Sequence, residues 1–235
     1  MASTVRGANA PVRLEWGKID TASPEQQARS QQVKKSSRAS AVQRQNSRGK
    51  VPWLVQFQGA VREEDKNRLK KAGADLKGYI PENAFLLEAT PQAIVKIAAL
   101  PEVKWVGEYR PDFKRANAVR KLIAESPDDV RECKVFLFHP EDVDRIGAEI
   151  AELPGAAVIR AEPMADRGMI RARLSGRAAE AVTAWGEVEW IEPHLERQLW
   201  NDVAVQSGKM NVSNAWSVLG LTGAGQTVAV CDTGL

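Results

Sequence analysis

A succession of strands and helices that occurs twice is the feature that most constrains the fold. The apolar pattern predicts strand–helix–strand–strand–helix–strand over residues 51–113, and the same order again over residues 131–199. The closing strands also match in sequence, because Glu102–Val106 reads EVKWV and Glu187–Ile191, 85 positions later, reads EVEWI. A repeat of this length indicates two copies of one small domain rather than a solenoid.

Local signals define the elements of the first copy. Trp53, Val55 and Phe57 fall on one face of a strand at residues 51–58. Thr90 and Pro91 supply an N-cap and a first-turn proline for a helix that Pro101 stops. The other predicted elements are a helix at residues 62–72, a hairpin at 75–89 with its turn at 81–83, and a strand at 103–109.

The second copy shows the same signals. An amphipathic helix begins near Pro140, and Val143, Ile146, Ile150 and Leu153 share one face of it. Strands are predicted at residues 133–138, 157–161, 169–174 and 188–191, with a helix at 177–185. Each copy should therefore form a ferredoxin-like α+β sandwich, an antiparallel sheet with two helices on one face. Trp105 and Trp190 are expected to pack in the core or on the sheet.

The segments outside the copies are interpreted from composition. Residues 1–50 carry ten Lys or Arg, three Asp or Glu and few large apolar residues, so a disordered basic tail is predicted there. Because aromatic residues do not alternate with its basic ones, a nucleic-acid-binding arm is disfavoured. Residues 114–130 are interpreted as a linker, with a short helical turn predicted at Leu122 and Ile123.

Few residues of the two copies offer chemistry. Cys133 lies in an apolar run and is interpreted as a small buried residue, as is Cys231 further on. His139 and His194 are predicted to be ordinary surface or capping histidines. No stretch is long enough for a membrane span, and no secretory signal is visible after Met1.

A buried strand ending in a carboxylate closes the chain. Thr227–Cys231 are small, β-branched or apolar, a glycine-rich turn precedes them, and Asp232 follows. One reading is an Asp that caps the next element, and another is a phosphate-binding loop. The second is disfavoured because Gly223–Gly225 precedes the strand, whereas nucleotide-binding loops follow one.

The terminal stretch resembles the catalytic-Asp block of subtilisin-like serine proteases. The residues that carry the resemblance are Ala215 and Trp216, then GLTGAGQTVAVCDTGL over residues 220–235. The resemblance implies that Asp232 is the Asp of an Asp–His–Ser triad, which orients the His and stabilises its imidazolium. No His or Ser follows Asp232 in these 235 residues, so this chain alone is expected to be inactive.

The resemblance also implies a role for the repeated domains. In the subtilase family a ferredoxin-like prodomain serves as folding template and inhibitor, with its C-terminal tail in the substrate cleft. The second copy, residues 131–199, is the better candidate by position, with Glu192–Trp200 as its tail and cleavage between about Leu199 and Gly208. Residues 200–235 would begin the catalytic domain, so the predicted fold class is α+β followed by an α/β parallel sheet.

Partners and cofactors follow from the same resemblance. The expected partners are a polypeptide substrate and the chain's own catalytic domain, with neither nucleic acid nor membrane. No cofactor is expected in this chain, although calcium is common in full-length members of the family, which are mostly secreted. The alternative is a tandem protease inhibitor or small-molecule regulatory pair without catalysis, for which the strand ending at Asp232 would be superfluous.

Overall fold

The computed structural model describes residues 10–15, 17–35, 44–196 and 212–227. The chain divides into two compact units, Met1–His194 and Leu195–Leu235, which are considered separately. The first unit contains antiparallel sheets and several helices, so the predicted α+β class is confirmed. Among the described helices, none has the length and apolarity needed to cross a bilayer.

One four-stranded sheet forms the first half of this unit. Its strands are antiparallel and lie in the order β4-β5-β3-β6. The predicted hairpin turn is present, and Glu82 and Asn83 in it have positive φ. The elements of this first half are β3 (Val51–Phe57), α2 (Glu63–Lys71), β4 (Asp75–Ile80), β5 (Ala84–Ala89), α3 (Pro91–Ala98) and β6 (Val103–Glu108).

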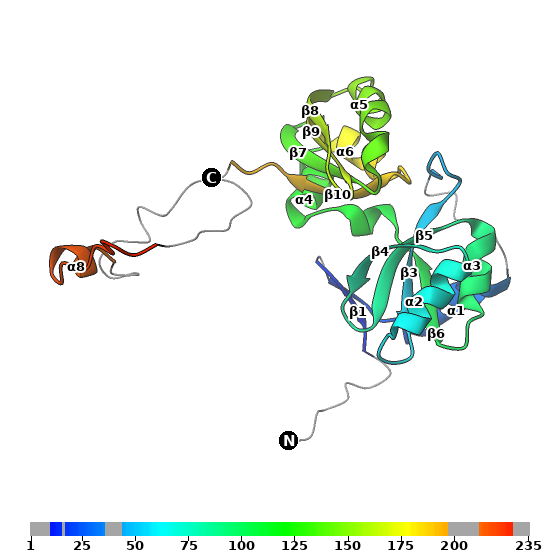
Figure 1. The fold of residues 1–235 in the computed structure, drawn as a ribbon. Coiled ribbons are helices and arrows are strands. Elements are labelled where there is room, and N and C mark those ends of the chain that lie inside the picture. Colours follow the sequence, from blue (N-terminus) through cyan, green and yellow to red (C-terminus); the bar gives the residue numbers. More distant parts are fainter. Residues whose placement is uncertain (1–9, 16, 36–43, 197–211, 228–235) are drawn as a thin grey trace, which may run out of the picture. The chain divides into compact units, whose positions relative to one another are not determined.

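Helices α2 and α3 cover one face of this sheet (Figure 1). Leu69 of α2 and Ile94 and Ile97 of α3 pack against sheet residues that include Trp53 and Val55. Helix α3 begins as predicted, with the Thr90 hydroxyl accepting a hydrogen bond from the Ala93 N–H. The predicted face of β3 therefore points into this core.

The opposite face of the sheet is also covered, by a segment for which the sequence predicted no structure. Strands β1 (Val12–Leu14) and β2 (Gly17–Ile19) form a ribbon, and α1 (Pro24–Lys35) follows it. Val12 and Ile19 are buried in one cluster with Leu54 and Trp105. The prediction that residues 1–50 are a disordered tail is therefore wrong for their described part.

The composition of residues 1–50 led to the wrong prediction because this segment needs few apolar residues of its own. The sheet face already supplies most of the apolar surface, and polar side chains satisfy one another at its edge. The Gln56 amide accepts a hydrogen bond from the Thr21 hydroxyl at 2.6 Å and donates one to the Ala10 carbonyl at 2.9 Å. Trp105 packs as predicted, and its indole N–H donates to the Gln26 carbonyl at 3.1 Å.

The segment that joins the halves is structured as well. It forms the 3-10 helix η1 (Pro111–Lys114) and the helix α4 (Asn117–Glu125). Val119 and Leu122 are buried, and α4 packs against α6 and β10 of the second half. The predicted turn around Leu122 is thus part of a longer helix.

The second half repeats the arrangement of the first. Its sheet is antiparallel in the order β10-β7-β9-β8, so in both sheets the first and third strands are central and the second and fourth are edges. Its elements are β7 (Val130–Leu137), the 3-10 helix η2 (Pro140–Asp142), α5 (Val143–Ala151), β8 (Ala156–Pro163), β9 (Gly168–Ser175), α6 (Gly176–Thr183) and β10 (Val188–Pro193).

Helices α5 and α6 enclose the second core against this sheet. Val143, Ile146 and Ile150 are buried on the predicted face of α5, and Leu153 packs against the same core. Cys133 is buried as predicted, and burial raises the pKa of its thiol to about 11. A reactive thiolate at this position is therefore excluded near neutral pH.

The two sheets differ on the face away from their helices. In β3 and β5 the residues of that face are all buried, namely Leu54, Gln56, Ala84, Leu86 and Glu88. In β7 and β9 six residues of that face are half-buried or exposed, namely Glu132, Lys134, Phe136, Met169, Arg171 and Arg173. The second sheet therefore keeps a partly exposed outer face, on which Trp190 lies beside Phe136.

The second unit is described only in part. Helix α8 (Val212–Ser217) lies where a short helix was predicted, and Gly220 after it has φ +63, as a glycine beyond a helix end commonly does. Trp216 and Leu219 are exposed. The predicted strand Thr227–Cys231 lies outside the described residues except for Thr227.

Candidate functional site

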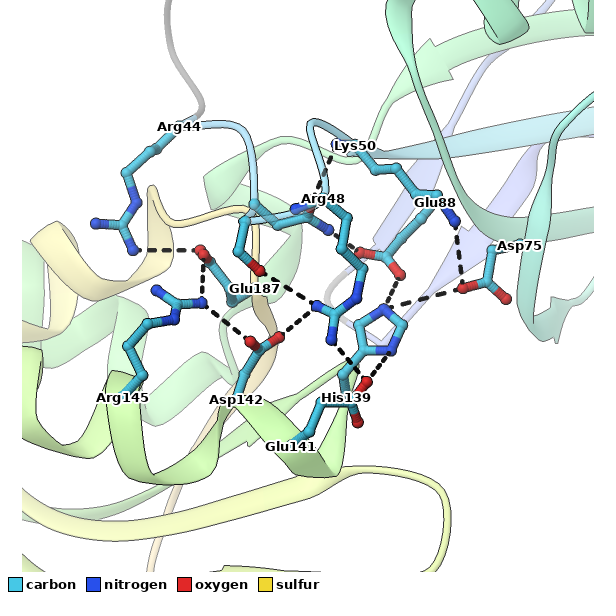
Figure 2. Close-up of polar contacts among 12 residues, drawn as sticks. Arg44, Arg48, Lys50, Asp75, Glu88, His139, Glu141, Asp142, Arg145 and Glu187 are labelled. Atoms are coloured by element: carbon cyan, nitrogen blue, oxygen red, sulfur yellow. Dashed lines mark hydrogen bonds and ion pairs between the residues drawn. The ribbon is translucent and has the colours of Figure 1, made fainter.

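The one predicted catalytic residue, Asp232, lies outside the described residues, as does Cys231. The described part of the chain nevertheless contains a dense polar cluster where the two halves of the first unit meet (Figure 2). We call this cluster the junction. It consists of residues 44–50, which we call the wedge, together with Asp75, Lys77, Glu88, Lys114, Arg115, His139, Glu141, Asp142, Arg145, Glu149, Thr183 and Glu187.

His139 occupies the N-cap position of η2, as one of its two predicted roles had it, but its side chain makes no capping hydrogen bond and lies near the centre of the junction, not on the surface. Its side chain is 14% exposed, and its Nε2 lies 2.6 Å from Oε2 of the fully buried Glu88. A carboxylate can only accept, so Nε2 must carry the proton and donate to Glu88. The His194 side chain is also largely covered, at 17% exposed, so the surface prediction is wrong for it too, and its backbone N–H donates to the Glu132 carbonyl at 2.8 Å.

Lys77 places an ammonium group among the same side chains. Its Nζ lies 2.9 Å from Oδ2 of Asp75, 3.0 Å from Oε2 of Glu88 and 3.2 Å from Nε2 of His139. Burial acts to raise the pKa of Asp75, but the hydrogen bond and charge of Lys77 outweigh burial and hold that pKa below its usual value. Asp75 and Glu88 thus share the Lys77 ammonium group as their counter-ion.

Asp75, Glu88 and His139 are also a donor set that a metal ion could use. Their ligand atoms lie within 4.8 Å of one another. One imidazole and two carboxylates suit zinc or a similar divalent ion. Lys77 Nζ is within hydrogen-bond distance of all three of these ligand atoms, however, so an entering metal ion would meet a like charge. The arrangement fits a site held by lysine better than a site held by metal.

The wedge runs between the halves and bonds to both. The Asn46 amide donates to Oε1 of Glu88 in the first half at 2.6 Å. The side-chain oxygen Oδ1 of Asn46 accepts hydrogen bonds from the backbone N–H groups of Arg48 and Lys50, which folds the wedge into a turn. The Arg44 N–H donates to the Ala184 carbonyl in the second half at 3.0 Å.

Gly186 makes room for the wedge. A Cβ at this position would lie 2.4 Å from the carbonyl oxygen of Arg44 and 2.7 Å from the backbone nitrogen of Asn46. Real Cβ atoms do not approach backbone atoms so closely, and backbone cannot rotate away as a flexible side chain can. Glycine is therefore required here for close approach.

Arginines tie the wedge to the acidic side chains of the second half. Arg48 donates to Asp142 at 2.7 Å and to Glu141 at 2.6 Å, and Arg44 donates to Glu149 at 2.7 Å. Arg145 joins this network by donating to Asp142, Glu149 and the buried Glu187. Burial opposes ionisation, yet these bonds hold the pKa of Asp142 and that of Glu149 below their usual values.

Two basic residues of the joining segment are buried beside the network. Lys114 is fully buried, and its Nζ donates to the Trp185 carbonyl at 2.7 Å. Arg115 donates to the hydroxyl of the buried Thr183 at 2.8 Å. An apolar contact accompanies these bonds, because Phe113 and Phe138 pack into the cluster on the outer face of the first sheet. The junction therefore couples the halves through both polar and apolar contacts.

The polar side chains of the junction have a structural role. Its carboxylates are engaged by arginine, lysine, histidine and asparagine, so none is left to act as a general base. The sequence analysis did not anticipate this site, although it contained one signal. Glu88 interrupts the apolar run AFLLEA of β5, and a carboxylate in a buried strand requires a partner. Its partners come from the wedge, β4 and the loop after β7, which no periodic pattern connects.

Comparison with known proteins gives one family match. A family model described as a domain of unknown function, DUF8729, matches residues 13–110. The match runs from β1 to just beyond β6, so it includes the segment that covers the outer face of the first sheet. No curated protein matches the chain.

Proposed function

We propose that this chain is the N-terminal portion of a subtilisin-like serine endopeptidase, and that its first unit contains two ferredoxin-like domains. The strand order supports the assignment of the domains. In each half the order strand–helix–strand–strand–helix–strand is combined with central first and third strands, which supports a ferredoxin-like arrangement. The terminal residues GAGQTVAVCDTG support the assignment of the protease, with Asp232 as its catalytic Asp.

The observation that carries the proposal further is the difference between the two outer sheet faces. The first is closed by β1, β2 and the contact with Phe138. The second retains half-buried apolar side chains, among them Phe136 and Met169, flanked by charged residues. We therefore assign the docking of the catalytic domain to the second half, whose sheet face is free and which immediately precedes the proposed catalytic domain.

The place where the sheet ends agrees with this assignment. Strand β10 ends at Pro193, and Leu195 after it is 73% exposed. In the proposed function the segment Glu192–Trp200 leaves the docked domain and enters the substrate cleft as an added strand. The first half then acts as a support that holds the second half through the junction.

Inhibition of a subtilisin-type protease by the purified chain tests the proposal. We expect slow hydrolysis of a fluorogenic peptide in the presence of the chain, and an inhibition constant at least about tenfold weaker for Met169→Glu, since a buried charge at an interface costs more than 1.4 kcal/mol. Gln92→Glu, which adds the same charge on the exposed side of α3, should inhibit as the unmodified chain does. No inhibition, or equal inhibition by both variants, would contradict the assigned docking face.

A further inference from the structure

Lys114 is the most deeply buried basic residue of the junction. Its side chain has no exposed surface, and Nζ donates to the Trp185 carbonyl, a neutral acceptor. The ion pairs among the described residues do not include Lys114, whereas Arg44, Arg48, Lys77 and Arg145 each pair with carboxylates. A buried ammonium with one carbonyl acceptor is poorly compensated for the loss of its hydration.

The groups around Lys114 come from every element packed against it. Glu187, in the turn between α6 and β10, and Glu88 of β5 attract its charge from a distance, and the neighbouring Arg115 repels it. Burial outweighs these charges and lowers the pKa of Lys114 to about 7. The amine is therefore half protonated close to neutral pH.

The acceptor of Lys114 belongs to the same short stretch that holds the wedge. The Ala184 carbonyl accepts from the Arg44 N–H, and the Arg44 guanidinium stacks on the Trp185 ring at 4.6 Å. Gly186 leaves the wedge backbone the space that a Cβ would fill, 2.4 Å from the Arg44 carbonyl oxygen. A movement of residues 184–186 that hydrates Lys114 must therefore disturb the contacts that these residues make with residues 44–46 of the wedge.

We propose that Lys114 is a proton-sensitive lock on the junction, closed when its amine is neutral and loosened when it becomes an ammonium. In the closed state the neutral amine donates to the Trp185 carbonyl and needs no counter-charge. In the protonated state the ammonium gains by reaching water, which shifts Trp185 and releases residues 44–46. The two halves then remain folded but are held less tightly to each other. This lock is independent of the proposed protease function.

The sign of the pH dependence follows from linkage. The pKa of Lys114 is about 7 in the closed junction and near 10.4 when the amine is exposed, so the open state binds more protons between these values. Opening is therefore favoured as the pH falls from above 10 to 7 and levels off below 7. Between pH 9 and pH 7 the opening equilibrium constant should rise about 50-fold.

Amide hydrogen exchange of the whole chain, corrected for the intrinsic pH dependence of exchange, tests the lock. In the unmodified chain, protection of residues 44–46 and 184–187 should fall about 50-fold from pH 9 to pH 7. Protection of β7 and β9 in the same samples reports global unfolding, which also hydrates Lys114, so it should fall by a similar factor but stay well above the protection of residues 44–46 and 184–187. Lys114→Met, which keeps the length of the side chain, should be well protected at both pH values, and Lys121→Met on the exposed side of α4 should behave as the unmodified chain does.

Two results would overturn the lock. One is an unmodified chain whose protection at residues 44–46 is the same at pH 7 and pH 9. The other is a Lys114→Met variant that retains the pH dependence. If Lys114→Met does not fold, an NMR titration of lysine side chains in the unmodified chain decides instead. A lysine with a midpoint near 7 supports the lock, and midpoints all near 10 or above refute it.

Discussion

At the scale of the residue, the junction depends on a few positions where neither size nor charge can change freely. Glu88 is fully buried and receives hydrogen bonds from Asn46 and His139, in addition to the charge of Lys77. Each partner comes from a different part of the chain. Removing any one of them leaves a buried carboxylate partly unpaired, which costs more than the pair contributes when intact.

Gly186 allows a test of close packing that involves no charge. Gly186→Ala should lower the free energy of unfolding by about 1–3 kcal/mol, because its Cβ would overlap backbone atoms of Arg44 and Asn46. Gly78→Ala is the matched control, since no atom lies within 4 Å of the Cβ added there. Urea unfolding of both variants measures the difference. Equal stability of the two would mean that the wedge does not rest against Gly186.

At the scale of the element, periodicity predicted what each strand and helix contributes to its own core. The alternation of Trp53, Val55 and Phe57 and the spacing of Val143, Ile146 and Ile150 are both realised in the structure. Periodicity could not show what covers the second face of a sheet, because that depends on a partner elsewhere in the chain. Residues 1–50 were therefore mistaken for a tail, and the junction was missed for the same reason.

The N-terminal ribbon can be tested as an element. Val12 is fully buried against the first sheet, so Val12→Ala should lower the free energy of unfolding by about 2 kcal/mol through lost burial and the cavity left behind. Val130→Ala removes the same atoms from a strand residue that is 48% exposed and should cost less than about 1 kcal/mol. Chemical denaturation compares the two. If Val12→Ala cost no more than Val130→Ala, the ribbon would not contribute to the fold.

At the scale of the whole first unit, two apolar cores are joined by contacts that are largely ionic. The cores of the halves are built from apolar side chains. The junction instead gathers seven basic residues, and carboxylates of the junction pair with five of them, namely Arg44, Arg48, Lys50, Lys77 and Arg145, whereas Lys114 and Arg115 are the other two. Acid should therefore affect the connection between the halves more than either core. As carboxylates become protonated, the cations remain and repel one another.

Arg48 makes the acid dependence measurable. The pKa of Asp142 is held below its usual value, so its contribution is fully present above about pH 4 and is lost as the pH falls through the lowered pKa. Arg48→Gln should accordingly lower the free energy of unfolding by about 1.5–3 kcal/mol at pH 7, the range for hydrogen bonds to charged groups, and by less as the pH falls from 4 toward 2. Urea titrations at pH 7 and pH 3 give both values.

An exposed ion pair separates this effect from general surface electrostatics. Arg177 donates to Asp128 at 2.8 Å, but both side chains are largely exposed. Arg177→Gln should leave the free energy of unfolding nearly unchanged at either pH, because water screens such pairs. If Arg48→Gln lowered the free energy of unfolding as much at pH 3 as at pH 7, the packing of Arg48, and not its charge, would hold the wedge. The halves would then be joined by shape, and acid would unfold them together instead of first loosening the junction.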